Sequence, residues 1–97
     1  MEVTDVRLRM VKTQNEDLKL KAYADINFDN SFVVHGLKVI EGEKEIFVAM
    51  PSRKMPGGEY KDIAHPINPE LRKEITEAVI EKYEEVKKLE NLNEIQY

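Results

Sequence analysis

The sequence lacks the residues and patterns on which several classes of protein depend. It contains no Cys, which excludes a disulfide framework, thiolate metal sites and a Cys nucleophile. No apolar run approaches the roughly 18 residues that a membrane-spanning helix needs. The N-terminus, MEVTDVRLRM, alternates and carries charges, unlike the apolar region of a signal peptide. These features favour a cytoplasmic protein.

Recognisable catalytic and cofactor motifs are also missing. The two His residues, His35 and His65, do not form a helical HxxxH pair, and without Cys they are weak evidence for zinc. The four Gly residues form neither a phosphate loop nor a dinucleotide fingerprint. No Ser stands in a GxSxG setting. We therefore expect structural roles for both His residues, and no metal, cofactor, small-molecule substrate or enzymatic activity.

The length and charge distribution predict one small domain with an acidic end. The chain has 97 residues and a net charge of −4, and a single core is feasible at that length. Residues 1–40 and 41–73 each hold six bases and six acids, whereas residues 74–97 hold three bases and seven acids. The body is therefore neutral, and a phosphate-binding surface on it remains compatible with the negative total.

Strict alternation of apolar and polar residues predicts two half-buried strands near the N-terminus. One lies around residues 6–10 and the other at 18–28, with the polar run 13–17 as a turn between them. A second turn at 29–31 leads into residues 32–40 (FVVHGLKVI), which are apolar on both parities and are typical of a strand covered on both faces. In a regular strand, His35 would share the parity of Leu37 and Val39.

The remaining β signals are short. Residues 45–50 predict a strand that ends before Pro51, residues 52–58 (SRKMPGG) predict a loop, and residues 59–64 predict a fifth extended piece. A single helix covers only one face of such a sheet, so the third strand needs another cover. We expect a homodimer to supply it. The alternative is that residues 51–67 fold over that face.

One C-terminal helix is the second clear signal. Asn68 is a suitable N-cap, Pro69 suits the first helical position, and Glu70 favours the positive end of the helix dipole. Beyond Leu89 the periodicity fades, which predicts a domain at residues 1–88 and a frayed acidic tail at 89–97. The fold class is therefore α+β, with an antiparallel sheet of four to five strands before the helix. The apolar stripe of the helix contains Leu71, Ile75, Ala78, Val79, Tyr83 and Val86.

Binding chemistry is better represented than catalysis. Arg53 and Lys54 are adjacent in the Gly-containing loop, Lys61 follows the glycines, and Arg72 and Lys73 lie in the first turns of the helix. Phosphate sites commonly combine such bases with backbone N–H groups at loops and helix starts. The residues alone leave open that these are solvated charges offset by neighbouring acids.

A second basic set lies on the first two strands, and for this set a solvated sheet face is the stronger interpretation. Tyr23 and Tyr60 can stack on bases, although Tyr is more often simply packed. The second set contains Arg7, Arg9, Lys19 and Lys21.

Residues 47–68, FVAMPSRKMPGGEYKDIAHPIN, resemble the signature of the SpoVG family. VTDVRLR at 3–9, FVVHGLKVIEG at 32–42 and LRKEI at 71–75 are similar to the family pattern as well, so that the resemblance covers about residues 1–84. The sequence departs at Gly36, where many members carry Asp after the His. A role for an acid at that position is therefore not transferred.

The resemblance implies a small α+β dimer in the bacterial cytoplasm. Such proteins bind DNA, in some members RNA, and regulate developmental, septation, virulence or capsule genes. Carried onto this chain, the nucleic-acid contacts are Arg53, Lys54, Lys61, Arg72 and Lys73. The competing hypothesis is a septation-related protein-interaction module with only incidental nucleic-acid binding. Its docking segment would be the acidic tail with Leu89, Leu92 and Ile95.

Overall fold

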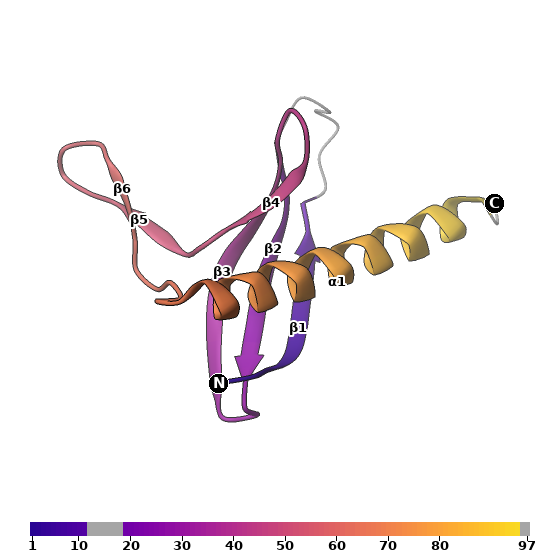
Figure 1. Ribbon diagram of the computed structural model, residues 1–97. Coiled ribbons are helices and arrows are strands. Elements are labelled where there is room, and N and C mark those ends of the chain that lie inside the picture. The colour runs from indigo at the N-terminus through magenta and orange to yellow at the C-terminus, as the bar shows by residue number, and fades with distance from the viewer. Residues whose placement is uncertain (12–18, 96–97) are drawn as a thin grey trace.

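The computed structural model describes residues 1–11 and 19–95, with side chains as far as residue 90. A four-stranded antiparallel sheet, in the order β1-β2-β3-β4, is crossed by one helix, and a separate two-stranded hairpin, β5–β6, projects from this body (Figure 1). The predicted α+β fold is confirmed. The elements are β1 (Val3–Met10), β2 (Leu20–Phe28), β3 (Phe32–Glu41), β4 (Ile46–Ala49), β5 (Ser52–Lys54), β6 (Tyr60–Asp62) and α1 (Pro69–Ile95).

The strand assignments follow the alternation in the sequence. The β1–β2 and β2–β3 pairs are antiparallel hairpin neighbours. Asp29 and Asn30 both have positive φ, and the Ser31 N–H donates to the Phe28 carbonyl at 2.9 Å, which is a tight turn of the kind that joins twisted strands. The predicted turn at 29–31 is therefore confirmed. The predicted turn at 13–17 and the start of the second strand at Leu18 lie outside the described residues.

The helix is capped and packed as its sequence predicts. The side-chain oxygen of Asn68 accepts a hydrogen bond from the Leu71 N–H at 2.7 Å, which satisfies one of the free N–H groups of the first turn. Ile75, Val79 and Tyr83 are buried against the sheet. The sheet side of this core consists of Val6, Ala22, Ala24, Ile26, Phe28, Leu37 and Val39, with Met50 beside them.

The helix extends further than its periodicity predicts. It continues to Ile95, six residues past Leu89, because adding residues to an existing helix requires far less free energy than starting one. The division into a domain at 1–88 and a frayed tail at 89–97 stays a prediction. In the described part of the chain, no helix is long and apolar enough to cross a membrane.

A β-bulge in β3 changes which residues face the helix. Ala24 pairs with Leu37 and Ile26 with Val34, so that two residues of β3, His35 and Gly36, lie opposite the single residue Asp25. Gly36 has a φ of 84°, a left-handed conformation that Gly adopts without strain. The bulge places Val34 and Leu37 on the same side of the sheet although three positions separate them.

This bulge corrects two expectations drawn from regular alternation. His35 does not share the face of Leu37 and Val39; its side chain lies on the outer face and is 70% exposed. Apolar residues occur at both odd and even positions of β3, but this does not mean that both faces of the strand are covered. Because of the bulge, Phe32 and Val34 lie on the core side together with Leu37. The reason for expecting a second copy over the outer face is therefore removed.

The outer face of the sheet, which α1 does not cover, is polar and internally paired. The carboxylate of Asp25 lies 3.2 Å from His35 Nδ1 and 3.8 Å from the Arg9 guanidinium, and it accepts a hydrogen bond from the Gly36 N–H at 3.3 Å. The guanidinium of Arg9 also lies over the ring of Tyr23, 5.6 Å from its centroid. Solvated ion pairs of this kind contribute little free energy, but they are compatible with a face in contact with water.

We predict that Gly36→Ala lowers the free energy of unfolding by about 1–2 kcal/mol, since an L residue in the left-handed region is strained by that amount. A Cβ at Gly36 meets no atom within 4 Å, so the loss arises from the backbone alone. Gly57→Ala is the matched control, because its Cβ is equally free and its φ is not positive. Urea denaturation measures both; equal stability of the two variants would contradict the strain at Gly36.

We also predict a stability loss at high pH that depends on Tyr83. Burial raises the pKa of the Tyr83 hydroxyl above its ordinary value of 10.0, and the carboxylates of Glu41 and Glu90 raise it further. The contribution of the neutral Tyr83 hydroxyl to the free energy of unfolding is therefore complete below pH 10. It is lost as the pH rises above 10, because Tyr83 ionises in the unfolded chain before it ionises in the folded one. Urea midpoints measured from pH 8 to about pH 11 should fall less for Tyr83→Phe than for wild type, whereas the exposed Tyr60→Phe should follow wild type.

Candidate nucleic-acid interface

The basic residues expected on a loop lie on a two-stranded ribbon. Arg53 and Lys54 belong to β5, and Lys61 belongs to β6. The loop prediction for residues 52–58 is therefore wrong for its first three residues. Three-residue strands are too short for alternation to reveal them, and only the Pro-Gly-Gly run indicates a hairpin turn.

The turn that closes the ribbon explains its composition. The Gly58 N–H donates to the Met55 carbonyl at 2.9 Å, and the Met55 N–H donates to the Glu59 carbonyl at 2.6 Å. Gly58 has a φ of 91°, which few other residues adopt without strain. At the base, the Ile63 N–H donates to the Pro51 carbonyl at 2.8 Å. These backbone bonds set the register of the ribbon and hence the positions of its charges.

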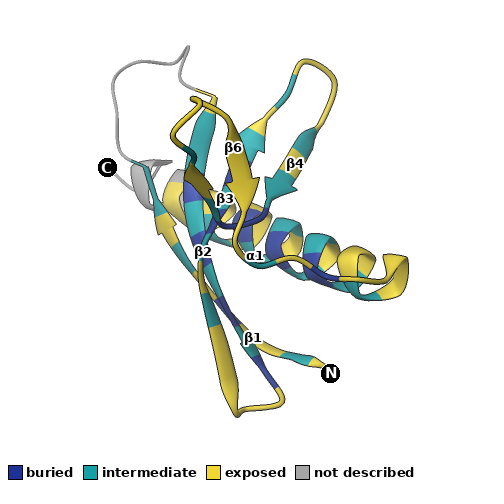
Figure 2. Cartoon of the chain, turned by 90° about the vertical axis from the view of Figure 1, so that its left-hand side faces the viewer, coloured by how far each residue is buried: buried dark blue, intermediate teal, exposed yellow. Residues whose placement is uncertain are grey.

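The register brings two positive charges face to face. Arg53 lies directly opposite Lys61, and Lys54 lies opposite Tyr60. All four residues are exposed, as are the turn and β6 as a whole (Figure 2). Among the residues that the structure describes, no carboxylate forms an ion pair with Arg53, Lys54 or Lys61. Like charges opposite each other destabilise a hairpin, so the folding of the ribbon gives no reason for this pair.

The other two candidate residues lie on a different element. Arg72 and Lys73 are exposed in the first turns of α1, which follows the ribbon after residues 63–68. The ammonium of Lys73 lies 4.0 Å from the Glu77 carboxylate, with both side chains exposed. Arg72 has no such partner within the described residues. Of the five predicted contacts, the structure thus brings three together on the ribbon and places two at the helix start.

The second basic set is largely neutralised. Arg7 lies 3.5 Å from Asp5, Arg9 pairs with Asp25, and the Lys21 ammonium lies 3.7 Å from Glu41. Lys19 is exposed beside the described end of β2. The pairing of β1 with β2 places Arg9 opposite Tyr23, two residues from Lys21, and Arg7 opposite Asp25. Their charge is balanced locally, however, which favours the solvated-face interpretation.

The two His residues have protein partners. His35 contacts Asp25 on the outer face, and the Nδ1–H of His65 donates to the Pro66 carbonyl at 3.0 Å. In the described part of the chain, no three or more His, Asp or Glu side chains gather as a metal site. The absence of a cofactor and of enzymatic activity stays a prediction.

The fold and the exposed charges define a class: a small α+β protein in which one helix packs on an antiparallel sheet and a basic ribbon projects from it. Residues 1–85 match the model of the SpoVG family. The chain therefore belongs to the SpoVG family.

Similar proteins from three organisms agree with this assignment. A "Putative septation protein SpoVG" of Clostridium perfringens is 52% identical over 90 residues, which are 93% of this chain and 97% of that protein. Proteins of the same name are 53% identical in Thermoanaerobacter sp. (strain X514), over 93% of this chain and 95% of that protein, and 56% identical in Caldicellulosiruptor saccharolyticus, over 89% and 94%.

We predict that Arg53→Glu stabilises the ribbon, because it converts the like-charge pair with Lys61 into an opposite-charge pair. A gain of about 0.6 kcal/mol would slow amide hydrogen exchange in β5 and β6 about threefold. Lys54→Glu is the matched control, since it lies opposite Tyr60 rather than a base. Faster exchange in Arg53→Glu than in wild type would show that the positive charge at residue 53 is needed for the ribbon itself.

Proposed function

We propose that this protein binds nucleic acid, DNA and also RNA, through the ribbon and the start of α1, and that it regulates gene expression linked to sporulation and septation. The contact residues are Arg53, Lys54 and Lys61 on the ribbon, with Arg72 and Lys73 on the helix. It acts as a homodimer in the cytoplasm, so that two ribbons contact one nucleic acid.

The observation that carries the proposal is that Arg53 and Lys61 lie opposite each other on an exposed ribbon and have no carboxylate partner among the described residues. This arrangement is unfavourable for the isolated protein and becomes favourable when a phosphate lies between or beside the two cations. The net charge of −4 does not oppose it, because 74–97 carries the acidic excess and binding depends on the local potential.

The shape of the ribbon supports a contact within a groove as well as with phosphates. A two-stranded ribbon fits the major groove of B-DNA, and an exposed Tyr60 beside Lys54 offers a ring for stacking on an unpaired base of RNA. The exposed face of α1 is a poorer candidate, since acids dominate it beyond Lys73. The ribbon is therefore the element that contacts the bases, and the helix start supplies further phosphate contacts.

The link to septation is supported by the relatives, several of which are named "Putative septation protein SpoVG". At more than 50% identity over about nine-tenths of each chain, a shared role is the simplest expectation. A nucleic-acid-binding regulator that acts on septation genes accounts for both the name and the basic ribbon.

The test is binding of the purified protein to labelled duplex DNA and single-stranded RNA across a salt series. Two copies of Arg53, Lys54 and Lys61 provide about six phosphate contacts, which contribute about −5 to the log–log slope on duplex DNA, and the helix-start residues add to this value. Arg53→Ala/Lys54→Ala removes four of the ribbon contacts, so the slope should become shallower by about 3.6 and the affinity should fall on all sequences.

Lys44→Ala/Lys88→Ala is the matched control, because it removes the same number of exposed charges from the β3–β4 turn and from α1 far from its start. This variant should bind as wild type does. Equal effects of the two double variants would show that the binding is not local to the ribbon. No binding of the folded protein to either polymer at low salt would overturn the proposal and favour the protein-interaction module.

A further inference from the structure

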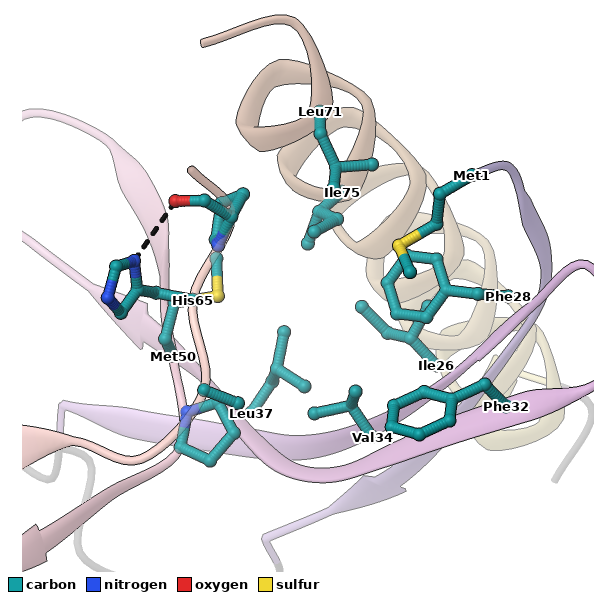
Figure 3. A pocket seen from close by; sticks show the side chains of 13 residues that line it. Met1, Ile26, Phe28, Phe32, Val34, Leu37, Met50, His65, Leu71 and Ile75 are labelled. Atoms are coloured by element: carbon teal, nitrogen blue, oxygen red, sulfur yellow. Dashed lines mark hydrogen bonds between the residues drawn. The ribbon is translucent and has the colours of Figure 1, made fainter. Parts of the chain in front are cut away.

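A polar pocket lies on the outer face of the sheet, where β1, β2 and β3 approach the turn between β2 and β3. It differs from the groove between the start of α1 and the sheet, which is lined largely by apolar side chains (Figure 3). The polar pocket has a volume of about 370 Å³, which lies in the range of small-ligand sites, about 300–1,000 Å³. Arg7, Asp25, Asn27, Val33 and His35 are among its lining residues.

The β-bulge in β3 opens this pocket beside Asp25. His35 and Gly36 lie opposite Asp25, and a Cβ at Gly36 would meet no atom within 4 Å, so this part of the face is left open. The bulge also directs His35 to the outer face, where its side chain is 70% exposed. Bulges often redirect a side chain in this way beside a functional site. The result is an imidazole and free space next to a carboxylate.

Asp25 keeps one hydrogen-bond acceptor that the described chain does not use. Its side chain is 21% exposed. Its contacts with His35 Nδ1 at 3.2 Å, with the Gly36 N–H at 3.3 Å and with the Arg9 guanidinium at 3.8 Å are all made by Oδ1. Within the described residues, no hydrogen bond engages Oδ2. The contacts of Oδ1 therefore fix the carboxylate, and Oδ2 can accept a hydrogen bond from a ligand.

The groups around Asp25 match the other parts of a nucleotide. Arg7 lies opposite Asp25 on β1 and offers a cation for a phosphate. Its contact with Asp5 joins two exposed side chains and contributes little free energy. The Asn27 amide offers both a donor and an acceptor, as the polar edge of a base requires. Val33, opposite Asn27 and 43% exposed, offers an apolar surface for the face of the base.

We propose that this pocket binds one unpaired ribonucleotide of an RNA strand. Asp25 Oδ2 accepts a hydrogen bond from the ribose 2′-hydroxyl, Arg7 contacts the phosphate and Asn27 contacts the edge of the base. A carboxylate recognises the ribose in the same way in dinucleotide-binding folds, and the 2′-hydroxyl is the group by which proteins distinguish RNA from DNA. This site goes beyond the proposed function, because it contains none of the ribbon residues and gives the chain a means of selecting RNA.

Two simpler ligands fit the pocket less well. A phosphate ion by itself would lie near the Asp25 carboxylate as well as near Arg7, and like charges repel each other. A metal ion would need more carboxylate or imidazole ligands, and in the described part of the chain no three such side chains gather. A ribonucleotide keeps its phosphate and its hydroxyl apart, so that each meets a group of matching character.

The test is binding of the full chain to a short single strand of one sequence, prepared as RNA, as 2′-O-methyl RNA and as DNA. Wild type should bind RNA about tenfold more tightly than the other two strands, which is the lower limit expected for one hydrogen bond to a charged acceptor. Asp25→Asn should abolish this preference. The amide carbonyl still accepts the Gly36 N–H, whereas the amide nitrogen takes the place of Oδ2 and cannot accept.

Asp5→Asn is the matched control, because it removes the same charge from the same face, outside the lining of the pocket. It should change the affinity for all three strands alike and keep their ratio. Arg7→Ala should flatten the log–log salt slope by about 0.7 on each single strand and also keep the ratio. Lys44→Ala, between β3 and β4, should leave the slope unchanged.

A second measurement uses only the wild-type chain and is informative even if Asp25→Asn does not fold. In a ¹⁵N NMR titration with the RNA strand, the backbone amide signals of Asp25, Asn27 and His35 should shift, and the 2′-O-methyl strand should shift them less. A ribonucleoside 5′-monophosphate serves as the comparison ligand. Saturation of the same signals by this monophosphate at a concentration where the RNA strand does not bind would overturn RNA as the ligand.

Two results of the strand comparison would overturn the site: equal affinity of wild type for the three strands, or an RNA preference that folded Asp25→Asn retains. Duplex DNA binding, measured in parallel, separates this failure from that of the proposed function. Arg53→Ala/Lys54→Ala should weaken binding to the duplex, whereas Asp25→Asn should leave it unchanged.

Discussion

One helix that covers one face of a four-stranded sheet is the constraint on which the rest of this structure depends. The stripe of Ile75, Val79 and Tyr83 buries the inner face of the sheet, and nothing within the described chain covers the outer face. The outer face therefore has to be compatible with water, and its charged residues meet this requirement by pairing with one another around Asp25. An open apolar groove of about 220 Å³, lined among others by Val34 of β3, Ile26 of β2 and Leu71 of α1, is the remaining consequence, since the first turns of α1 do not fill the space above the start of β3.

The bulge at His35 and Gly36 reconciles an apolar strand with this constraint. Without it, the apolar residues at the two ends of β3 would lie on opposite faces of the sheet. With the bulge, Val34 and Leu37 both face the helix side, and His35 is directed to the polar face. The Asp25 carboxylate accepts the Gly36 N–H, so the residue that organises the outer face also satisfies the backbone of the bulge.

The surface of the chain carries two chemistries. Within the described residues, the ribbon presents cations that have no ion-pair partner, whereas the groove between the start of α1 and the sheet is lined by apolar side chains. The two surfaces meet at the base of the ribbon, where Pro51 and Ala64 line the groove next to β5 and β6 and the Pro51 carbonyl accepts the Ile63 N–H. The homodimer of the proposed function would place two ribbons on one molecule, and linked contacts of this kind bind a long polyanion more tightly than one ribbon does.

The sequence by itself determined the elements whose signal is local. Alternation marked β1 and β2, and Asn68-Pro69 with the apolar stripe marked α1, because each pattern reports burial of one face at a fixed period. The basic candidates Arg53, Lys54 and Lys61 were also visible, together with the motifs of the SpoVG family. Only the tertiary structure decided the face of His35, the pairing of β5 with β6 and the position of the groove. These depend on which strand lies opposite which residue, and a one-residue bulge or a three-residue strand leaves no period in the sequence from which that pairing can be predicted.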